Sequence, residues 1–168
     1  MMSQQIQHVA LSFVFAFVFW ALLVGSLSQQ ELVAGLLVAA SVAAMTAERQ
    51  PILAGFRLAP MAPVSFLVYL GVLLLALLRA NLDLARRVLT PSLPIRPAMV
   101  QVSTSLRSDL GRLVLANSIT LTPGTLTVDV VDDVLTVHWI DCPPGADIAA
   151  ATAAIADGFE RHLRGFLK

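Results

Sequence analysis

The sequence predicts a membrane protein in which an α-helical region of three transmembrane helices is followed by a small α+β domain in the cytoplasm. Two observations support this fold class. Of the 168 residues, 57% are hydrophobic and 13% are charged, and the mean hydropathy is +0.80, which lies outside the range of ordinary soluble domains. The charges are also unevenly distributed, since nine of the eleven Lys and Arg residues lie from Arg79 onward. Because the net charge is zero, this asymmetry indicates orientation in a membrane rather than nucleic-acid binding.

The chain changes character in the stretch 81–97, which divides it into three parts. Residues 1–80 are predicted to form the transmembrane region, 81–97 an amphipathic basic stem with a proline-rich link, and 98–168 the cytoplasmic α/β domain. An arginine near an anionic membrane surface gains about 1 kcal/mol. We therefore expect the arginines in this stretch and just before it to contact headgroups or a partner, namely Arg79, Arg86, Arg87 and Arg96.

Three apolar runs are the candidate spans, at about residues 9–27, 32–47 and 58–78. A helix needs about 20 apolar residues to cross a hydrocarbon core of about 30 Å. The first run has no basic segment before it and is longer than the apolar part of a secretory signal, so we interpret it as a retained span. A polar break, Ser28 to Glu31, leaves room only for a tight turn, so the second helix should return antiparallel beside the first.

The second run is marginal in length, but every fourth residue is small. Such a face lets another helix backbone approach closely. Whether it packs on another span of this chain or on another polypeptide is left open by the sequence. The four residues are Gly35, Ala39, Ala43 and Ala47.

The third run continues past Arg79 as an apolar stripe through Leu82, Ala85 and Leu89, which predicts one helix that leaves the membrane and ends at the prolines. With three spans, the distribution of Lys and Arg places the C-terminal part in the cytoplasm and the N-terminus outside. If the second run is re-entrant, the N-terminus lies inside instead.

The C-terminal part begins with a predicted strand, Met99 to Thr104, and a helix capped by Ser105 or Ser108. Thr122-Pro-Gly124 suits a type II turn, because proline favours its second position and glycine the positive φ of its third. The apolar stripe of the helix should contain one polar exception, Asn117. Its positions are Leu106, Leu110, Leu113, Val114, Asn117 and Leu121.

A hairpin follows, with Asp132-Asp133 as a two-residue loop. This register pairs Val130 with Leu135, Val128 with Val137 and Leu126 with Trp139 on one apolar face. After Gly145 and Asp147, one last helix should bury Ile148, Ile155, Phe159, Leu163 and Phe166. The order is β-α-β-β-α, which is related to the ferredoxin-like fold with one element fewer.

Catalytic or metal-binding constellations are hard to find. The three histidines are far apart in sequence, and Cys142 has no partner at zinc-ligand spacing. Asp129 and His138 form the only candidate acid/base couple, and a solvated hairpin face explains them more simply. The three predicted spans contain no Asp, Glu, Lys, Arg or His, so by itself this chain should not move ions by a charged relay. We expect no cofactor, no metal and no enzymatic activity.

One long run carries a family resemblance: Leu106 to Thr125, which includes Ala-Asn-Ser-Ile-Thr-Leu-Thr-Pro-Gly-Thr, followed by Val137-His-Trp-Ile-Asp141. Together with Asn81 to Leu89 and Pro94 to Pro97, it resembles the E-type subunits of the multi-subunit Mrp-type (Mnh/Pha) sodium/proton antiporters. The resemblance implies an accessory subunit in the plasma membrane of a prokaryote, whose partners are large complex I-like subunits and small membrane subunits. The residues of the run singled out are Asn117, Ser118, Thr120, Thr122, Pro123 and Gly124.

The run has two interpretations. It can be structural, with Asn117 and Thr122 satisfying backbone groups and Pro123-Gly124 setting the turn. Alternatively, Arg107 and Arg112 with their neighbours face partner subunits or lipid headgroups. For the whole chain, the alternatives to an accessory antiporter subunit are a self-standing membrane-anchored binding or regulatory module and, least favoured, a membrane enzyme using Asp129 and His138.

Overall fold

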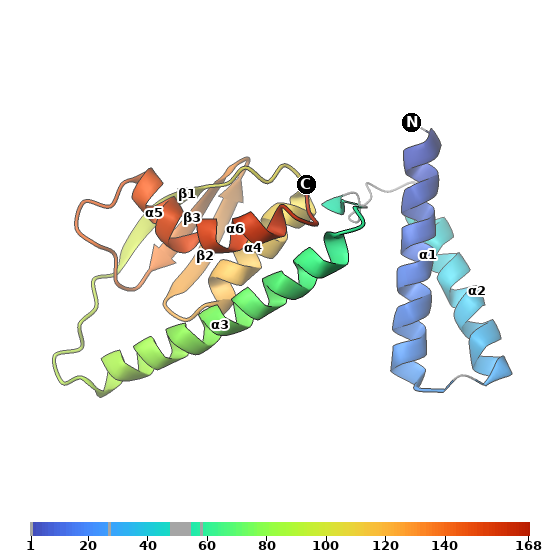
Figure 1. Cartoon of the computed structure of the whole chain (residues 1–168), viewed down its shortest axis with the longest axis horizontal. Coiled ribbons are helices and arrows are strands. Elements are labelled where there is room, and N and C mark those ends of the chain that lie inside the picture. The colour runs from blue at the N-terminus through green and yellow to red at the C-terminus, as the bar shows by residue number, and fades with distance from the viewer. Residues whose placement is uncertain (1, 27, 48–54, 58) are drawn as a thin grey trace. The chain divides into compact units, whose positions relative to one another are not determined.

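The computed structural model describes residues 2–26, 28–47, 55–57 and 59–168. The chain forms two compact units, Met1–Ala54 and Gly55–Lys168, which are described separately. Figure 1 labels their helices and strands along the chain.

The first unit is a helical hairpin of α1 (Met2–Val24) and α2 (Gln29–Thr46). Gly25 ends α1 with a φ of 64°, and the Ser28 hydroxyl accepts a hydrogen bond from the Glu31 amide at 3.4 Å to cap α2. The polar break is therefore shorter than predicted, because Gln29 to Glu31 already form the first turn of α2. The predicted end of the first span, residue 27, lies outside the described residues.

The first α-helix of the second unit along the chain is the long α3 (Ala62–Leu89). It runs without interruption past Arg79 to Leu89, as the stripe predicted. Its start at Ala62, with Pro63 in the first turn, is later than the predicted residue 58, which lies outside the described residues. Of the described helices, α2 and α3 are long and apolar enough to cross a membrane, and α1 holds a shorter apolar stretch, Val9–Val24.

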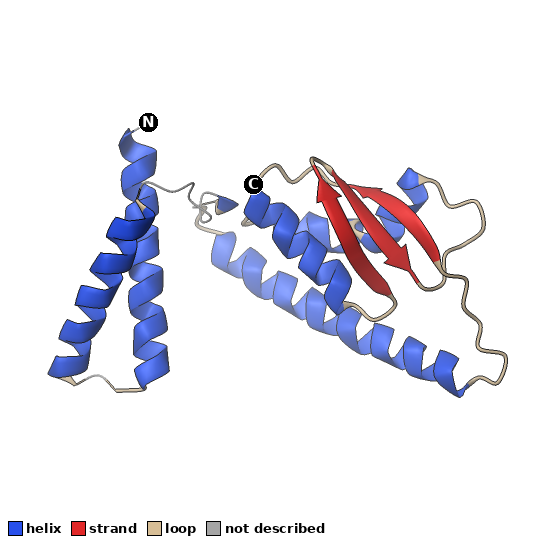
Figure 2. Ribbon diagram, turned by 180° about the vertical axis from the view of Figure 1, so that it is seen from behind, coloured by secondary structure: helices blue, strands red, loops and turns tan. Residues whose placement is uncertain are grey.

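A three-stranded antiparallel sheet follows α3, and Figure 2 shows it in red. Its strands are β1 (Ala98–Ser103), β2 (Thr125–Val131) and β3 (Val134–Trp139), in the order β1-β3-β2. The helices of this part are α4 (Asp109–Leu121), α5 (Ile148–Ile155) and α6 (Asp157–Leu163). Ser108 and Asp147 cap α4 and α5 with their side chains. The single last helix that was predicted is instead two short helices, which meet at Ala156.

The hairpin register is correct only near its loop. Val131 pairs with Val134 and Val130 with Leu135, but a bulge at Val128 shifts the rest, so that Thr127 pairs with Val137. The predicted pairs of Val128 with Val137 and Leu126 with Trp139 are wrong. Because a shift by one residue reverses the faces of a strand, Leu126 and Val128 point away from the core and are exposed.

Helices α4, α5 and α6 cover one face of the sheet, and α3 packs on their outer side, against α6. The central core contains Val102, Leu115, Leu135, Val137 and Leu163, all fully buried. In α4 the buried face follows Gly111, Leu115, Ser118 and Ile119. The predicted stripe is wrong at three positions, since Leu113, Asn117 and Leu121 are exposed.

The end of the chain closes this unit by backbone contacts. The Lys168 amide donates to the Gly55 oxygen at 2.9 Å, and the Arg57 amide donates to the Phe166 oxygen at 2.8 Å. The Ser108 hydroxyl, at the start of α4, donates to the Lys168 oxygen at 2.8 Å. Residues before α3 and after α6 are therefore held in one structure with the sheet.

Candidate functional site

A groove lies between α3 and the rest of the second unit, and we call it the junction groove. Its volume is about 630 Å³. The lining is apolar on α3 around Val72 and Leu75 and charged farther along the helix at Arg79, Asp83 and Arg87. The remaining lining comes from the turn after α4, the end of β3 and helices α5 and α6, namely Thr122 to Thr125, Trp139 to Asp141, Ala153, Ala154, Ile155, Gly158, Phe159 and Arg161.

An ion-pair cluster closes the charged end of the groove. One Asp141 oxygen accepts from Arg87 Nη1 at 2.7 Å, and the other accepts from Arg96 Nε at 3.1 Å. Arg87 also binds Asp83 at 2.6 Å and the Pro94 carbonyl oxygen at 2.9 Å. The hydrogen bonds from Arg87 and then from Arg96 lower the pKa of the Asp141 carboxyl, against a smaller opposing effect of desolvation. The cluster thus ties the end of α3 to the segment before β1 and to the end of β3.

The predicted membrane-surface arginines therefore divide into two groups. Arg87 and Arg96 are held by Asp141, so their charges are compensated inside the unit. Arg79 and Arg86 are exposed, and their guanidinium groups make no hydrogen bond or ion pair with any described residue.

The other two predicted contact arginines lie at the start of α4. Arg112 donates from Nε to the Leu106 carbonyl oxygen at 3.1 Å, which gives it a structural role in the loop before the helix. Arg107 has an exposed side chain, and its amide donates to the Lys168 oxygen at 3.2 Å.

The run singled out in the sequence mostly makes local contacts that build the end of α4. The Thr122 hydroxyl donates to the Ser118 carbonyl oxygen at 2.8 Å, and the Thr120 hydroxyl accepts from the Thr127 amide at 3.1 Å. Gly124 has a φ of 98°, as the predicted turn requires, and Pro123 lines the junction groove beside it. Asn117 is exposed.

Ser118 makes the longest connection of the run. It is 1% exposed, and its hydroxyl lies 2.7 Å from the hydroxyl of Tyr69 on α3. It also donates to the Val114 carbonyl oxygen at 2.6 Å. The Tyr69 hydroxyl is therefore the donor to Ser118, and the pair joins α3 to α4 inside the core.

A second buried polar cluster surrounds Glu160 on α6, which the sequence did not reveal. The residue is 4% exposed, and its carboxylate accepts hydrogen bonds from the Thr104 hydroxyl at 2.8 Å, the Ser105 amide at 3.0 Å and the Ser105 hydroxyl. Arg164 lies 3.9 Å away. The sequence could not indicate this burial of a single Glu on a short helix, because the hydrogen-bond donors to its carboxylate lie more than fifty positions earlier in the chain.

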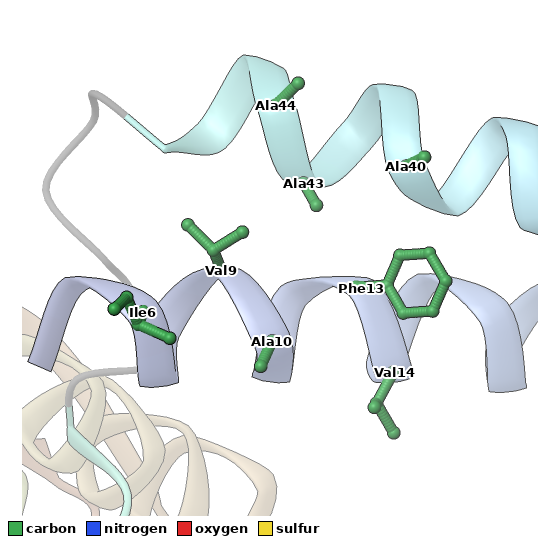
Figure 3. Close-up of a pocket in the computed structure, with 8 residues that line it drawn as sticks. All are labelled: Ile6, Val9, Ala10, Phe13, Val14, Ala40, Ala43 and Ala44. Carbon is green, nitrogen blue, oxygen red and sulfur yellow. The ribbon is translucent and has the colours of Figure 1, made fainter. Parts of the chain in front are cut away.

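The small-residue face of α2 is buried against α1. Ala39 and Ala43 are covered, and a Cβ on Gly35 would lie 2.6 Å from the Trp20 ring. Ala47 lies at the end of this face and is half-buried. Farther along the hairpin, an apolar hollow of about 610 Å³ opens beside Val9, Phe13 and Ala43, and Figure 3 shows the residues around it. Within the first unit, this face packs on the preceding helix of the same chain.

The structure shows no catalytic centre in the described part of the chain. No group of His, Cys, Asp and Glu there is arranged to hold a metal ion. Asp129 accepts from the Val130 amide at 2.9 Å and pairs with Thr136, whereas His138 pairs with Leu126; no hydrogen bond joins these two described side chains. The Cys142 thiol lies 3.4 Å from the Pro143 carbonyl oxygen.

The chain matches the family model described as Na+/H+ ion antiporter subunit over residues 13–165. The E subunit of the Na(+)/H(+) antiporter of Alkalihalophilus pseudofirmus is 44% identical over 89 residues, which are 52% of this chain and 54% of that protein. The chain thus matches about half the length of this relative. The E1 subunit of the Na(+)/H(+) antiporter of Staphylococcus haemolyticus is 32% identical over 140 residues, 80% of this chain and 82% of that protein.

A solved structure is also similar in fold. It is a chain of the membrane-bound sulfane sulfur reductase (MBS), an archaeal respiratory membrane complex, with a TM-score of 0.81 and 40% sequence identity. The match covers 94% of this chain and 97% of the other.

Proposed function

We propose, from the premise that the chain belongs to the Na+/H+ ion antiporter subunit family, that it is an accessory subunit of a membrane complex that exchanges Na+ for protons. It contributes to the assembly or stability of the complex and does not carry the ion relay. The family is one of transporter subunits rather than of enzymes, and its relatives are E-type antiporter subunits. Similarity to a chain of a respiratory membrane complex supports a place in a multi-subunit assembly.

The observation that carries the accessory role is the chemistry of the apolar helices. Proton and cation paths in membranes use ionisable side chains at depth. From Val9 to Val24, from Leu32 to Thr46 and from Ala62 to Leu78, the described helices contain none. The hydroxyls of α2 are engaged within their own helix, since Ser41 donates to the Leu37 oxygen at 2.9 Å and Thr46 to the Val42 oxygen at 2.8 Å. The ion path therefore belongs to other subunits.

The proposed location is the plasma membrane of a prokaryote, with the second unit in the cytoplasm. The excess of Lys and Arg after residue 78 supports this side. Three crossings would place the N-terminus outside, and two crossings would place it inside. Other integral membrane subunits and anionic headgroups are the proposed partners, and no nucleic acid is involved.

A self-standing membrane-anchored binding module is the second candidate. It is favoured by one observation: the free face of the sheet exposes Met99, Leu126, Val128 and Val131, so it could bind a soluble partner. In that case the second unit would act without large membrane subunits.

Co-purification separates the two candidates. The affinity tag belongs at the N-terminus, because the backbone of Lys168 is bonded to Gly55 and Ser108. Extraction in mild detergent should recover large polytopic membrane proteins with the tagged chain. If the chain is recovered without other membrane proteins and the soluble partner keeps its full activity, the result supports the binding module and contradicts the antiporter role.

The accessory role has its own control. Glu31, in the first turn of α2, is the only carboxylate among the described residues of the first unit. A Glu31→Gln variant should keep Na+/H+ exchange in membrane vesicles that contain the other subunits. Loss of exchange in a fully assembled Glu31→Gln complex would show that this chain takes part in the relay.

A further inference from the structure

Helix α3 has two faces of different character. Its inner face packs on the rest of the second unit through Tyr69, Val72, Leu73 and Ala76. The opposite face, which we call the outer stripe, follows helical spacing over the whole helix and is exposed. Its residues are Val64, Leu67, Gly71, Leu74, Leu78, Leu82, Ala85 and Leu89. The stripe contains no polar side chain, even beyond Arg79, where the sequence predicted that the membrane-crossing part ends.

The contacts of the inner face show what would accompany α3 into a bilayer. Gly165 packs closely on Ser65, since a Cβ added to Gly165 would lie 2.6 Å from the Ser65 side chain. Phe166 contacts Phe66 with ring centroids 5.4 Å apart. Arg161 lines the junction groove together with Val72. Helix α6 and its flanks therefore lie beside the most apolar turns of α3.

These neighbours are charged. Helix α6 and the residue that follows it carry Asp157, Glu160, Arg161, His162 and Arg164. If residues 62–78 crossed a bilayer surrounded by lipid, these groups would be placed at membrane depth, where charged side chains are costly. The strands behind them would also be removed from water, although Gln101 and Asp129 on the sheet are exposed. The packing of the second unit therefore argues against α3 as a span.

The positions of the arginines indicate what covers the outer stripe instead. At 100° per residue, Arg79 and Arg86 lie on one flank of the stripe, about 90° from its centre. Both are exposed and have no ionic partner among the described residues. Arg87 faces the other way and is held by Asp83 and Asp141. An apolar stripe with free arginines at its edge matches a membrane surface, where aliphatic stems lie in the apolar region and charged heads reach the phosphates.

We propose that α3 lies in the plane of the cytoplasmic membrane surface, with the outer stripe in the lipid and Arg79 and Arg86 binding anionic phospholipid headgroups. The sheet and helices α4 to α6 then lie on the water side of α3. At about 1.5 Å per residue, the 28-residue helix covers about 42 Å of surface. Helix α3 is then not a membrane span.

This inference rests on the membrane location in the proposed function but not on the antiporter role. Co-purification tests the role, whereas the depth of α3 tests the inference. An in-plane helix in a chain that purifies without antiporter subunits would refute only the role.

The experiment measures depth along the outer stripe in the full chain. Single cysteines at Val64, Leu74, Leu78 and Leu82 are placed in a Cys142→Ser background, spin-labelled and examined in vesicles by their accessibility to oxygen and to a water-soluble relaxation agent. The in-plane helix predicts a shallow depth of about 5–10 Å that is nearly equal at all four positions. A spanning helix predicts a gradient instead, because it moves about 1.5 Å per residue along the membrane normal: the label at Leu74, nearest the middle of residues 62–78, should lie deepest, and the label at Leu82 should reach water. That gradient would overturn the inference.

Two further results complete the test. Labels shielded from both oxygen and water in the assembled complex would overturn the inference in favour of a partner protein covering the stripe. For the headgroup contacts, the Leu82 label is compared in phosphatidylglycerol and phosphatidylcholine vesicles. It should lie deeper in the anionic vesicles, and the Arg79→Gln/Arg86→Gln variant should lose the difference. Equal depths for the unmodified arginines in both lipids would refute the headgroup contacts.

Discussion

The hydrogen bond between Tyr69 and Ser118 offers a quantitative test of the packing of α3 on the rest of the second unit. Both residues are buried, and their hydroxyl oxygens are 2.7 Å apart. Because the Ser118 hydroxyl donates its proton to Val114, the two single substitutions should not cost the same. Tyr69→Phe removes a donor and leaves only one lone pair of Ser118 unused. Ser118→Ala leaves the Tyr69 hydroxyl buried without an acceptor.

The magnitudes follow from this asymmetry. Loss of one neutral hydrogen bond costs about 1 kcal/mol, and a buried donor without a partner raises the cost to about 2 kcal/mol. For a unit of this size, 1 kcal/mol corresponds to about 4 °C in Tm. We expect Tyr69→Phe to lower Tm by about 4 °C and Ser118→Ala by about 8 °C. The double variant leaves no buried hydroxyl donor without an acceptor, so it should fall by about 4 °C rather than by the sum of about 12 °C, which gives a coupling free energy of about 2 kcal/mol.

The assay is thermal unfolding in detergent, followed by the fluorescence of Trp139 on β3. The chain has two tryptophans, so a Trp20→Phe background leaves Trp139 as the sole reporter of the second unit. Ser92→Ala is a matched control, because this exposed serine makes no hydrogen bond to any described residue. Additive losses, or a larger effect of Tyr69→Phe than of Ser118→Ala, would refute the reasoning that α3 is joined to α4 through this bond.

Two other predictions concern the ion-pair cluster around Asp141 and the helical hairpin of α1 and α2. Because Arg87 lowers the pKa of folded Asp141 from 3.8, the Asp141 carboxylate stabilises the fold above that pH and loses this effect as the pH falls below it. Asp141→Asn should therefore lower Tm by a few degrees at pH 7, and the difference in Tm from the parent chain should disappear below about pH 4. A difference in Tm that is unchanged at low pH would contradict this. Gly35→Leu places a side chain against Trp20, which costs about 1–3 kcal/mol, so it should reduce the monodisperse yield in size-exclusion chromatography. In the control Gly71→Leu, the added Cβ meets no atom within 4 Å, and the yield should not fall. Equal losses in both variants would show that α1 and α2 do not pack as described.

Much of the local structure could be predicted from the sequence, because it depends on residues close together in the chain. Ser108 and Asp147 cap their helices, and Gly124 takes the positive φ of its turn. The continuation of α3 to Leu89 follows from its apolar spacing, and Thr90 ends it shortly before Pro91. These features arise from hydrogen bonds or steric preferences within a few residues.

The errors occurred where two distant segments meet. The bulge at Val128 reverses part of β2 because Thr125 and Thr127 bond to backbone oxygens of α4, at 2.6 Å to Ile119 and 3.1 Å to Ala116. The buried face of α4 is rotated because it must satisfy the sheet on one side and Tyr69 on the other. No periodicity in a single element contains that information.

The residues of the candidate site divide in the same way, between properties that the sequence predicts and contacts that depend on distant segments. The sequence was sufficient to predict a membrane chain with a basic second half and apolar helices without ionisable groups, because composition and linear pattern determine these properties. Its resemblance to E-type subunits indicated the family. Only the tertiary structure decided that Arg87 and Arg96 meet at Asp141 while Arg79 and Arg86 stay free, that Glu160 is buried beneath Thr104 and Ser105, and that α3 packs along one face on charged helix α6. Each of these depends on which side of an element faces a distant partner, and the hydropathy along the chain does not contain that information.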